Sequence, residues 1–267
     1  MLFSLMKKVL KLKRGVKLNV AAASDVGLVR DANEDRFCVI SSPETIDGLD
    51  ALFVVADGMG GHAAGEVASS MAVEHICHDF TRRSDTRRTQ PNDLLEHLKL
   101  SVQAANSRIY EEAVCDRRLG GMGTTLTALG LSGEELLIAH VGDSRAYLME
   151  GNAITQLTQD HSWVGEQVAL GMLSAKEARE HPDRNVITRA LGLSGEVKID
   201  AGRRPLPKRC TLLLCSDGLY DSVLDEDMVG TVLSARSLEA GCRKLIKLAN
   251  DRGGHDNITL VLARIAR

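Results

Sequence analysis

Aromatic residues are scarce in this sequence, where Trp, Tyr and Phe together make up 3% of 267 residues. Proteins that bind single-stranded nucleic acid usually stack bases on aromatic side chains, so this scarcity argues against such a platform. An excess of charge of one sign is also lacking, because the chain has 33 basic and 36 acidic residues and a net charge of -3 at pH 7. A broad nucleic-acid surface needs a concentrated basic face. Hydrophobic residues nevertheless reach 44%, which predicts an aliphatic core.

Long apolar runs are missing as well, so no membrane-spanning helix of about 18 residues is predicted. Residues 1–18 form a basic leader in which lysines and one arginine interrupt every short apolar stretch. A secretory signal needs an apolar run after its charges and is therefore not expected. We interpret the leader as frayed or locally packed, with a short amphipathic helix on a membrane surface as the alternative. We expect a cytoplasmic location, with weak peripheral membrane contact through the leader left open.

The six cysteines contain no C-x-x-C pair, which argues against a zinc ribbon or a thioredoxin-type motif. A chain of this length needs no disulfide staples, and its cysteines lie in apolar stretches. We therefore predict reduced, buried thiols. Cys77 and Arg83 match the C-x5-R pattern of thiol-based phosphatases. That chemistry needs a glycine-rich phosphate loop, and none is present there, so we interpret the match as chance.

Proline is rare, with five residues, and neither internal repeats nor a low-complexity linker divide the chain. Pattern and composition predict strands at 36–40, 52–56, 125–131, 136–141, 145–149, 211–216 and 258–265. They predict helices at 65–80, 91–114, 224–233 and 238–250, with short helices and turns over 159–191. Regular alternation of strand and helix is absent. The order therefore favours an α+β fold with mainly antiparallel sheets and a single domain.

Apolar runs in this sequence repeatedly meet an acidic residue at one end. Five runs share this feature, and the acidic residues are Glu34 with Asp35, Asp57, Asp143, Asp217 and Asp256. A single Asp-Gly is typical of an ordinary turn, so the interpretation depends on the set. Several carboxylates brought together without a counter-ion would raise one another's pKa and lose solvation. A hard divalent cation such as Mg²⁺ or Mn²⁺ would resolve this, because it prefers carboxylate, carbonyl and water oxygens.

Seven ordered motifs resemble the metal-dependent protein phosphatases of type 2C, and bacterial members most of all. The motifs are VRDANED, ADGMGGHAAGE, GMGTTLTAL, HVGDSRAYL, RNVITRALG, LLLCSDGL and GGHDNITLVLARI. The resemblance extends from about Leu18 to the C-terminus. It implies a four-layer α-β-β-α sandwich, with two mainly antiparallel sheets flanked by helices. It also implies hydrolysis of phosphoserine and phosphothreonine in proteins by a two-metal-activated water, without a phosphoenzyme intermediate.

By position, the resemblance assigns a metal-binding role to seven residues. Asp57 would bridge two Mn²⁺ or Mg²⁺ ions, and the Gly58 carbonyl would bind one of them. Asp217 and Asp256 would complete the first ion's ligands. A third, weaker ion would involve Asp143. The residues implied to hold metal-bound waters are Glu34 and Asp35.

The resemblance also implies a catalytic group made of Arg30, His62 and Asp57. The planar fork of Arg30 would clamp the substrate phosphate, since it can donate two hydrogen bonds. His62 would protonate the leaving alkoxide. Taken alone, Arg30 is more typical of a surface arginine, and His62 is also typical of a turn or helix cap. Asp143 could similarly close a turn, and Thr124 could touch the metal-bound waters or be an ordinary strand threonine.

Residues 19–267 are expected to form one catalytic domain, with a flap insert at about 160–190 beside the active site. Trp163 in this insert would contact substrate or anchor the flap in the core. The implied partners are phosphorylated Ser/Thr proteins, together with a Ser/Thr kinase and its targets, and a monomer is the default. Neither nucleic acid nor a membrane span is expected.

Two competing hypotheses come from different classes of protein. The spacing Gly58-x-Gly60-x-x-Ala63 fits the dinucleotide fingerprint, but the repeated βαβ pattern that supports such a site is missing. The other hypothesis is a catalytically silent, phosphoprotein-binding relative of the same fold. Such relatives usually lose a metal aspartate, whereas Asp57, Asp217 and Asp256 are all present.

Overall fold

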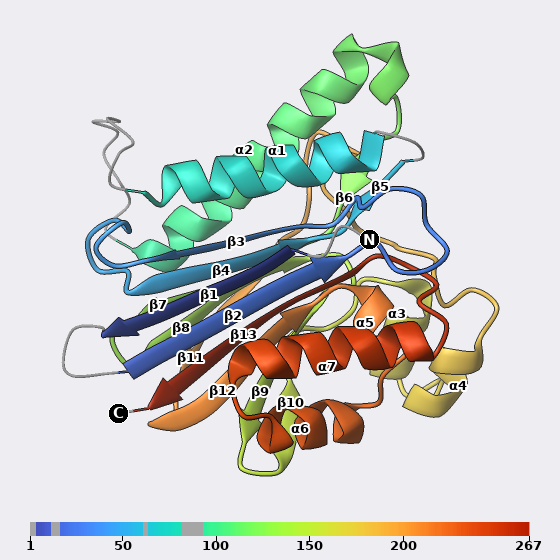
Figure 1. The fold of residues 1–267 in the computed structure, drawn as a ribbon. Helices are drawn as coiled ribbons and strands as arrows, with labels where there is room; N and C mark the ends of the chain where they lie inside the picture. Colours follow the sequence, from blue (N-terminus) through green and yellow to red (C-terminus); the bar gives the residue numbers. More distant parts are fainter. Residues whose placement is uncertain (1–3, 12–16, 61–63, 82–92, 267) are drawn as a thin grey trace.

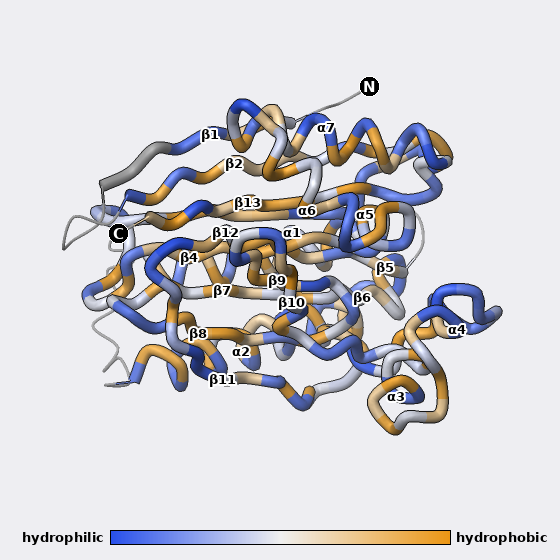
Figure 2. The backbone as a smooth tube through the Cα atoms, turned by 90° about the horizontal axis from the view of Figure 1, so that it is seen from below, coloured by the Kyte–Doolittle hydropathy of each residue, from blue (hydrophilic) through white to orange (hydrophobic). Residues whose placement is uncertain are grey.

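The computed structural model describes residues 4–11, 17–60, 64–81 and 93–266. Two antiparallel sheets lie face to face, and helices cover their outer faces, which gives the four layers visible in Figure 1. The expected α+β sandwich is therefore confirmed. Three groups of buried residues fill the spaces between successive layers. Strands in the middle of the layers are mostly hydrophobic, whereas the peripheral helix α4 is hydrophilic (Figure 2).

One sheet has six strands and the other has five. The first has the order β1 (Ser4–Lys11), β2 (Lys17–Asp25), β13 (Ile258–Ala266), β12 (Arg209–Cys215), β9 (Arg145–Glu150) and β10 (Ala153–Gln156). The second has the order β11 (Asp200–Pro205), β8 (Glu135–Val141), β7 (Leu126–Ser132), β4 (Ala51–Ala56) and β3 (Arg36–Ser41). A two-stranded ladder joins β5 (Gly58–Met59) to β6 (Gly123–Thr124).

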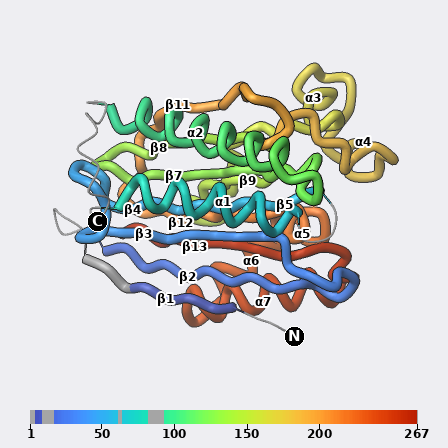
Figure 3. Tube along the Cα trace, turned by 90° about the horizontal axis from the view of Figure 1, so that it is seen from above, coloured from blue at the N-terminus to red at the C-terminus, as the bar shows by residue number. Residues whose placement is uncertain are grey.

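Two long helices, α1 (Ala64–Asp79) and α2 (Leu94–Cys115), run along the outer face of the five-stranded sheet (Figure 3). The six-stranded sheet is covered by α5 (Asp217–Tyr220), α6 (Asp225–Ser234) and α7 (Leu238–Asp251). Beyond one end of the sheets lie α3 (Trp163–Ala169) and α4 (Ala175–Glu180), and a short 3₁₀ turn spans Arg117–Leu119. No helix in the described part of the chain combines the length and apolarity that crossing a membrane requires.

The longer helices agree closely with the sequence predictions, and two of them, α2 and α7, begin after clear capping residues. Asp93 precedes α2, and its carboxylate accepts hydrogen bonds from the backbone N–H groups of Leu95 and Glu96. Ser237 precedes α7 and accepts one from Ala240 in the same way. An oxygen side chain at this position satisfies N–H groups that have no partner within the helix.

The basic leader is packed into the fold over its residues 4–11, so these residues are neither frayed nor helical. Residues 4–11 form β1, which pairs antiparallel with β2 from Ser4 opposite Ser24 to Lys11 opposite Lys17. Alternate side chains of a strand point to opposite faces. Met6 packs against the core between the sheets, while Lys7 forms an ion pair with Glu239 of α7. The amphipathic-helix alternative is thus wrong for residues 4–11, because strand pairing satisfies this segment's backbone.

The prediction of six reduced thiols is also wrong. Cys38 in β3 and Cys77 in α1 form a disulfide, with their Cα atoms 6.8 Å apart. The two residues are 39 positions apart, and only the packing of α1 on β3 brings them together. Cys115 is exposed, contrary to expectation, whereas Cys210, Cys215 and Cys242 are buried as predicted. Because Cys77 is bonded to Cys38, it has no thiolate for C-x5-R chemistry in this state.

Candidate metal centre

Acidic residues gather at one end of the two sheets because the strands that carry them end there. Asp57 follows β4, Asp143 follows β8 and Asp217 follows β12. Asp256 lies just before β13, and Asp35 lies just before β3. Antiparallel pairing of β12 with β13 and of β3 with β4 brings the starts of β13 and β3 to the ends of β12 and β4. The fold thus brings five sequence-predicted carboxylates to one place.

These carboxylates interact strongly, which shows in their pKa values. Burial raises the pKa of Asp57 well above its usual range, and the charges of Asp35, Asp217, Asp143 and Asp256 raise it further. Burial, followed by the charges of Asp143, Asp256, Asp221 and Asp35, raises the pKa of Asp217 well above its usual range. Burial also raises the pKa of Asp35 to about 6 and that of Asp143 to about 7. Such a site is costly at neutral pH unless a cation neutralises it.

Two carboxylate oxygens in the cluster support a cation site. Asp35 Oδ1 and Asp217 Oδ1 are buried and have no hydrogen-bond partner among the described residues. Within the described ranges, no three His, Cys, Asp or Glu side chains already close on a single point. Like charges without a counter-ion are expected to stay apart in this way. An all-oxygen donor set suits Mg²⁺ or Mn²⁺, so the residues fit the expected ions.

Thr124 of β6 and Thr125, which lies between β6 and β7, hold the backbone of Asp57 in place. Thr125 Oγ1 accepts a hydrogen bond from the Asp57 N–H at 2.9 Å, and the Thr125 N–H donates to the Asp57 carbonyl at 2.9 Å. Thr124 Oγ1 also donates to the Asp57 carbonyl at 2.9 Å. Thr124 therefore helps to fix the Asp57 backbone, and its contact with metal-bound waters stays a prediction. Sequence reasoning did not identify Thr125.

Gly58 is required where three segments meet beside Asp57. A Cβ atom on Gly58 would lie 2.1 Å from the carbonyl oxygen of Gly65 and 2.7 Å from that of Glu34. Both are backbone atoms that cannot move aside cheaply. Glycine therefore lets the start of α1 and the loop before β3 approach the strand end closely.

Asn257 organises the loop that carries Glu34 and Arg30, and sequence reasoning missed it. Its Oδ1 accepts a hydrogen bond from the Glu34 N–H at 2.7 Å. Its Nδ2 donates to the carbonyls of Val26 and Ala32, each at 2.9 Å. An asparagine that bonds three backbone groups of one loop fixes that loop next to the neighbouring Asp256. The sequence offered one weak signal, the position of Asn257 between Asp256 and the start of β13.

Arg30 lies at the edge of the acidic cluster. Its Nη2 donates to Asp256 Oδ2 at 2.7 Å, and its side chain is 55% exposed. The hydrogen bond to Asp256 raises the pKa of Arg30, so the Arg30 guanidinium stays positively charged. The structure thus brings Arg30 to the site with much of its side chain open to solvent. His62, the predicted proton donor, lies outside the described residues.

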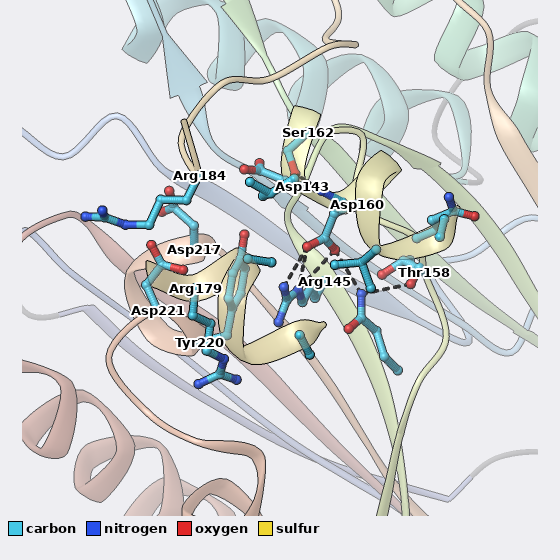
Figure 4. Close-up of a pocket in the computed structure, with 18 of the residues that line it drawn as sticks. Asp143, Arg145, Thr158, Asp160, Ser162, Arg179, Arg184, Asp217, Tyr220 and Asp221 are labelled. Carbon is cyan, nitrogen blue, oxygen red and sulfur yellow. Dashed lines mark hydrogen bonds and ion pairs between the residues drawn. The ribbon is translucent and has the colours of Figure 1, made fainter. Parts of the chain in front are cut away.

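A pocket of about 400 Å³ opens beside Asp143 and Asp217 and continues beneath α3 and α4. Asp221 and Arg184 also line it, and Figure 4 shows both near Asp217. Trp163 packs at a tilt against His181, with their ring centroids 4.7 Å apart, and is 37% exposed. This contact joins two parts of the flap insert to each other, so both roles expected for Trp163 stay predictions.

Asp160, at the start of the flap insert, makes a buried ion pair with Arg145 of β9. The Arg145 Nη2 donates to Asp160 Oδ2 at 2.6 Å, and its Nε donates to both carboxylate oxygens at 3.0 Å (Figure 4). The guanidinium carbon lies 3.6 Å from the centroid of the Tyr220 ring. These contacts join the base of the insert to the sheet and to α5.

Comparisons with known proteins agree with this geometry. The sequence profile of the family described as Protein phosphatase 2C matches residues 32–256. The serine/threonine phosphatase stp of Listeria welshimeri is 39% identical over 239 residues, which cover 90% of this chain and 92% of that protein. The structure resembles Stp1 from Staphylococcus aureus with a TM-score of 0.85 at 32% identity, covering 98% of each chain.

A structure of the catalytic domain of the serine/threonine protein phosphatase PstP contains two manganese ions. It matches this chain with a TM-score of 0.79 at 38% identity, covering 94% of this chain and all of that one.

Proposed function

The chain belongs to the protein phosphatase 2C family, and we propose that the acidic end of its two sheets is the phosphatase active site. The protein is an Mn²⁺- or Mg²⁺-dependent enzyme that hydrolyses phosphoserine and phosphothreonine in proteins. The observation that carries the site assignment is the group of mutually repelling carboxylates, two of which have buried oxygens without a hydrogen-bond partner in the described part of the chain. That arrangement needs cations in order to be stable at neutral pH.

In the proposed site, Asp57 bridges two ions, and the Gly58 carbonyl, Asp217 and Asp256 complete the ligand set. Asp57, Asp217 and Asp256 remain partly accessible, so ions can reach them from solvent. Glu34 and Asp35 orient water around the ions, and Asp143 contributes to a weaker third position. When bound, the ions lower the pKa of water, so that hydroxide is available near neutral pH.

Arg30 is proposed to bind the substrate phosphate. Its exposure and its position next to Asp256 allow it to donate to phosphate oxygens while it stays at the edge of the site. His62 remains our proposal for the proton donor to the leaving oxygen of serine or threonine. Proton donation matters here because an alkoxide is a poor leaving group.

The direct test is hydrolysis of a phosphothreonine peptide with Mn²⁺, with a chelator, and by an Asp57→Asn variant with Mn²⁺. We expect activity only in the first assay, with a loss of at least about 10³-fold in the other two. The chelator removes the ions, and Asp57→Asn removes the carboxylate that would hold both of them in position. Asp251→Asn is the matched control, since Asp251 is exposed on α7 and pairs with Lys247. Activity that survives both the chelator and Asp57→Asn would overturn the site assignment.

A protein serine/threonine kinase and its targets are the proposed counterparts, and the enzyme is proposed to act as a monomer. The family membership supports the first proposal, and the monomer is the default state. Unchanged Ser/Thr phosphorylation in cells lacking the protein would contradict the first, and a dimer in sedimentation would contradict the second.

Weak contact of the basic leader with anionic membranes is tested by sedimentation with vesicles containing phosphatidylserine.

A further inference from the structure

His161 is fully buried at the start of the flap insert, next to the loop that carries Asp143. Its backbone N–H donates to the Gly142 carbonyl at 2.7 Å, and its Nδ1 accepts from the Gly142 N–H at 3.0 Å. The residue before Asp143 is therefore held at both of its polar backbone groups by a single histidine.

The other polar groups of His161 bind two further segments. Its carbonyl accepts a hydrogen bond from the Thr188 N–H at 2.8 Å, at the far end of the insert. Its Nε2 lies 3.1 Å from Asp200 Oδ2 in β11, and Asp200 also accepts from Arg189 at 2.9 Å. His161 thus links the Asp143 loop, the two ends of the flap insert and the five-stranded sheet.

These contacts determine the protonation of the ring. The Gly142 backbone nitrogen can only donate, so His161 Nδ1 has to be without a proton. Nε2 then carries the proton and donates it to Asp200. Burial lowers the pKa of His161, which favours the same neutral form. A histidine fixed in one tautomer by a carboxylate partner is typical of side chains that position a site.

Gly142 needs such support because its backbone conformation is unusual. Its φ angle is +108°, a region that residues other than glycine rarely adopt. A Cβ atom there would lie 2.5 Å from Thr125 Cβ. Thr125 is also the residue that holds the backbone of Asp57. Close packing on one side and His161 on the other leave the Gly142–Asp143 segment little freedom.

We propose that His161 is a positioning residue for the metal centre, which fixes the Gly142–Asp143 backbone through Nδ1 and so directs the Asp143 carboxylate toward the third ion. The inference rests on the role proposed for Asp143 above. It assigns a function to a residue that binds neither ion nor substrate. The hydrogen bond that matters is the one from the Gly142 N–H, whereas the bond to Asp200 keeps the ring oriented.

Two substitutions separate these bonds. In His161→Asn, the amide oxygen takes the place of Nδ1 and can accept from Gly142, but the side chain is too short to reach Asp200. In His161→Gln, the terminal amide takes the place of Nε2 and can donate to Asp200, but no acceptor faces Gly142. The two variants thus form a matched pair, and thermal unfolding of each metal-free protein checks that both are folded.

The measurement is Mn²⁺ binding by calorimetry, together with hydrogen exchange of the Gly142 amide in the metal-free protein. We expect His161→Gln to weaken the weakest Mn²⁺ equivalent by at least about tenfold, as is typical when the partner of a metal ligand is lost. His161→Asn should keep that affinity within about threefold. Gly142 should exchange faster in the Gln variant only, and the two tighter equivalents should be unchanged in both variants.

Each outcome has one meaning. Equal behaviour of the two variants, or slow Gly142 exchange in His161→Gln, would overturn the role of His161 while leaving the phosphatase site intact. A wild-type protein that binds only two Mn²⁺ ions would overturn the third-ion role of Asp143, and the inference with it. Loss of the tight equivalents in both variants would instead mean that His161 supports the whole fold and has no specific positioning role.

Discussion

At the scale of single residues, environment decides what each aspartate can do. Asp116 is exposed and bonded to Arg118, which lowers its pKa to about 2. Asp143 is buried near other acids, and its pKa rises to about 7. The same side chain is thus an ordinary surface anion in one place and a strained, cation-requiring group in the other.

Arg30 offers a residue-scale prediction. Arg30→Ala should lower kcat/KM for a phosphothreonine peptide roughly 10- to 100-fold, because charged hydrogen bonds to phosphate are lost. Arg30→Lys should recover only part of this, since a lysine keeps the charge without the planar fork. Steady-state kinetics with saturating Mn²⁺ provide the measurement. If kcat/KM were unchanged in Arg30→Ala, the phosphate-binding role would be wrong.

At the scale of elements, β1 shows how a basic segment joins the fold. Its lysines lie on both faces, and Lys7 and Lys8 form ion pairs with Glu239 and Glu44. Lysines are common on edge strands, where they oppose pairing with other chains. The apolar packing of β1 comes from Met6, on the face of the strand that points toward the space between the sheets.

The two neighbouring apolar residues of β1 should differ in their effect on stability. Met6→Ala should lower the free energy of unfolding by about 1–2 kcal/mol, because Met6 is partly buried against the core. Leu5→Ala should change it little, since Leu5 is 37% exposed. Urea denaturation of both variants provides the comparison. Equal losses would mean that β1 contributes through backbone pairing alone.

The base of the flap insert supplies a second element-scale prediction. Asp160→Ala should destabilise the protein by about 3 kcal/mol, because it leaves the buried Arg145 guanidinium without its carboxylate. The matched control is Asp116→Ala, which breaks a similarly forked pair with the highly exposed Arg118 together with one capping hydrogen bond, and should be far less destabilising. Comparable destabilisation in both variants would contradict the burial argument.

At the scale of the whole molecule, the four layers place a costly charge cluster at the end of a large aliphatic core. Three buried groups of residues, one between each pair of layers, supply the stability that tolerates it. Metal binding then adds stability, because the ions bind the folded state.

This arrangement predicts how stability depends on pH. The folded-state pKa values of Asp35 and Asp143 are raised to about 6 and about 7, so the metal-free folded protein binds more protons than the unfolded chain between pH 4 and 7. Their contribution to stability is therefore full at low pH and is lost as pH rises through that window. Buried His140, whose pKa is lowered to about 3, acts in the opposite direction with or without metal.

The difference between the metal-loaded and metal-free proteins isolates the carboxylates. The gain in Tm on adding Mn²⁺ should be larger at pH 7.5 than at pH 5.5 by more than about 2–4 °C, which corresponds to about 1 kcal/mol. Differential scanning calorimetry with Mn²⁺ or with a chelator measures this gain. Asp57→Asn should reduce it at both pH values. A gain that is constant or falls with pH would contradict the argument.

The sequence alone determined the features that depend on local pattern. Pattern and composition located α1, α2, α6 and α7 to within a few residues. Continuous apolar runs located β4, β8 and β12, and their acidic ends identified the carboxylates that the fold brings together. The motif order identified the family, and with it the layered fold and the reaction.

Only the tertiary structure decided the contacts between segments that are distant in the chain. β1 and β11 are polar edge strands with weak patterns of their own, and they form because β2 and β8 present unpaired backbone groups. The Cys38–Cys77 bond depends on the packing of α1 on β3. Asn257 and His161 gain their roles because each meets loops whose backbone groups need partners. The local pattern of apolar and polar residues indicates which side chains become buried, whereas tertiary packing determines which group becomes the partner of a buried polar group.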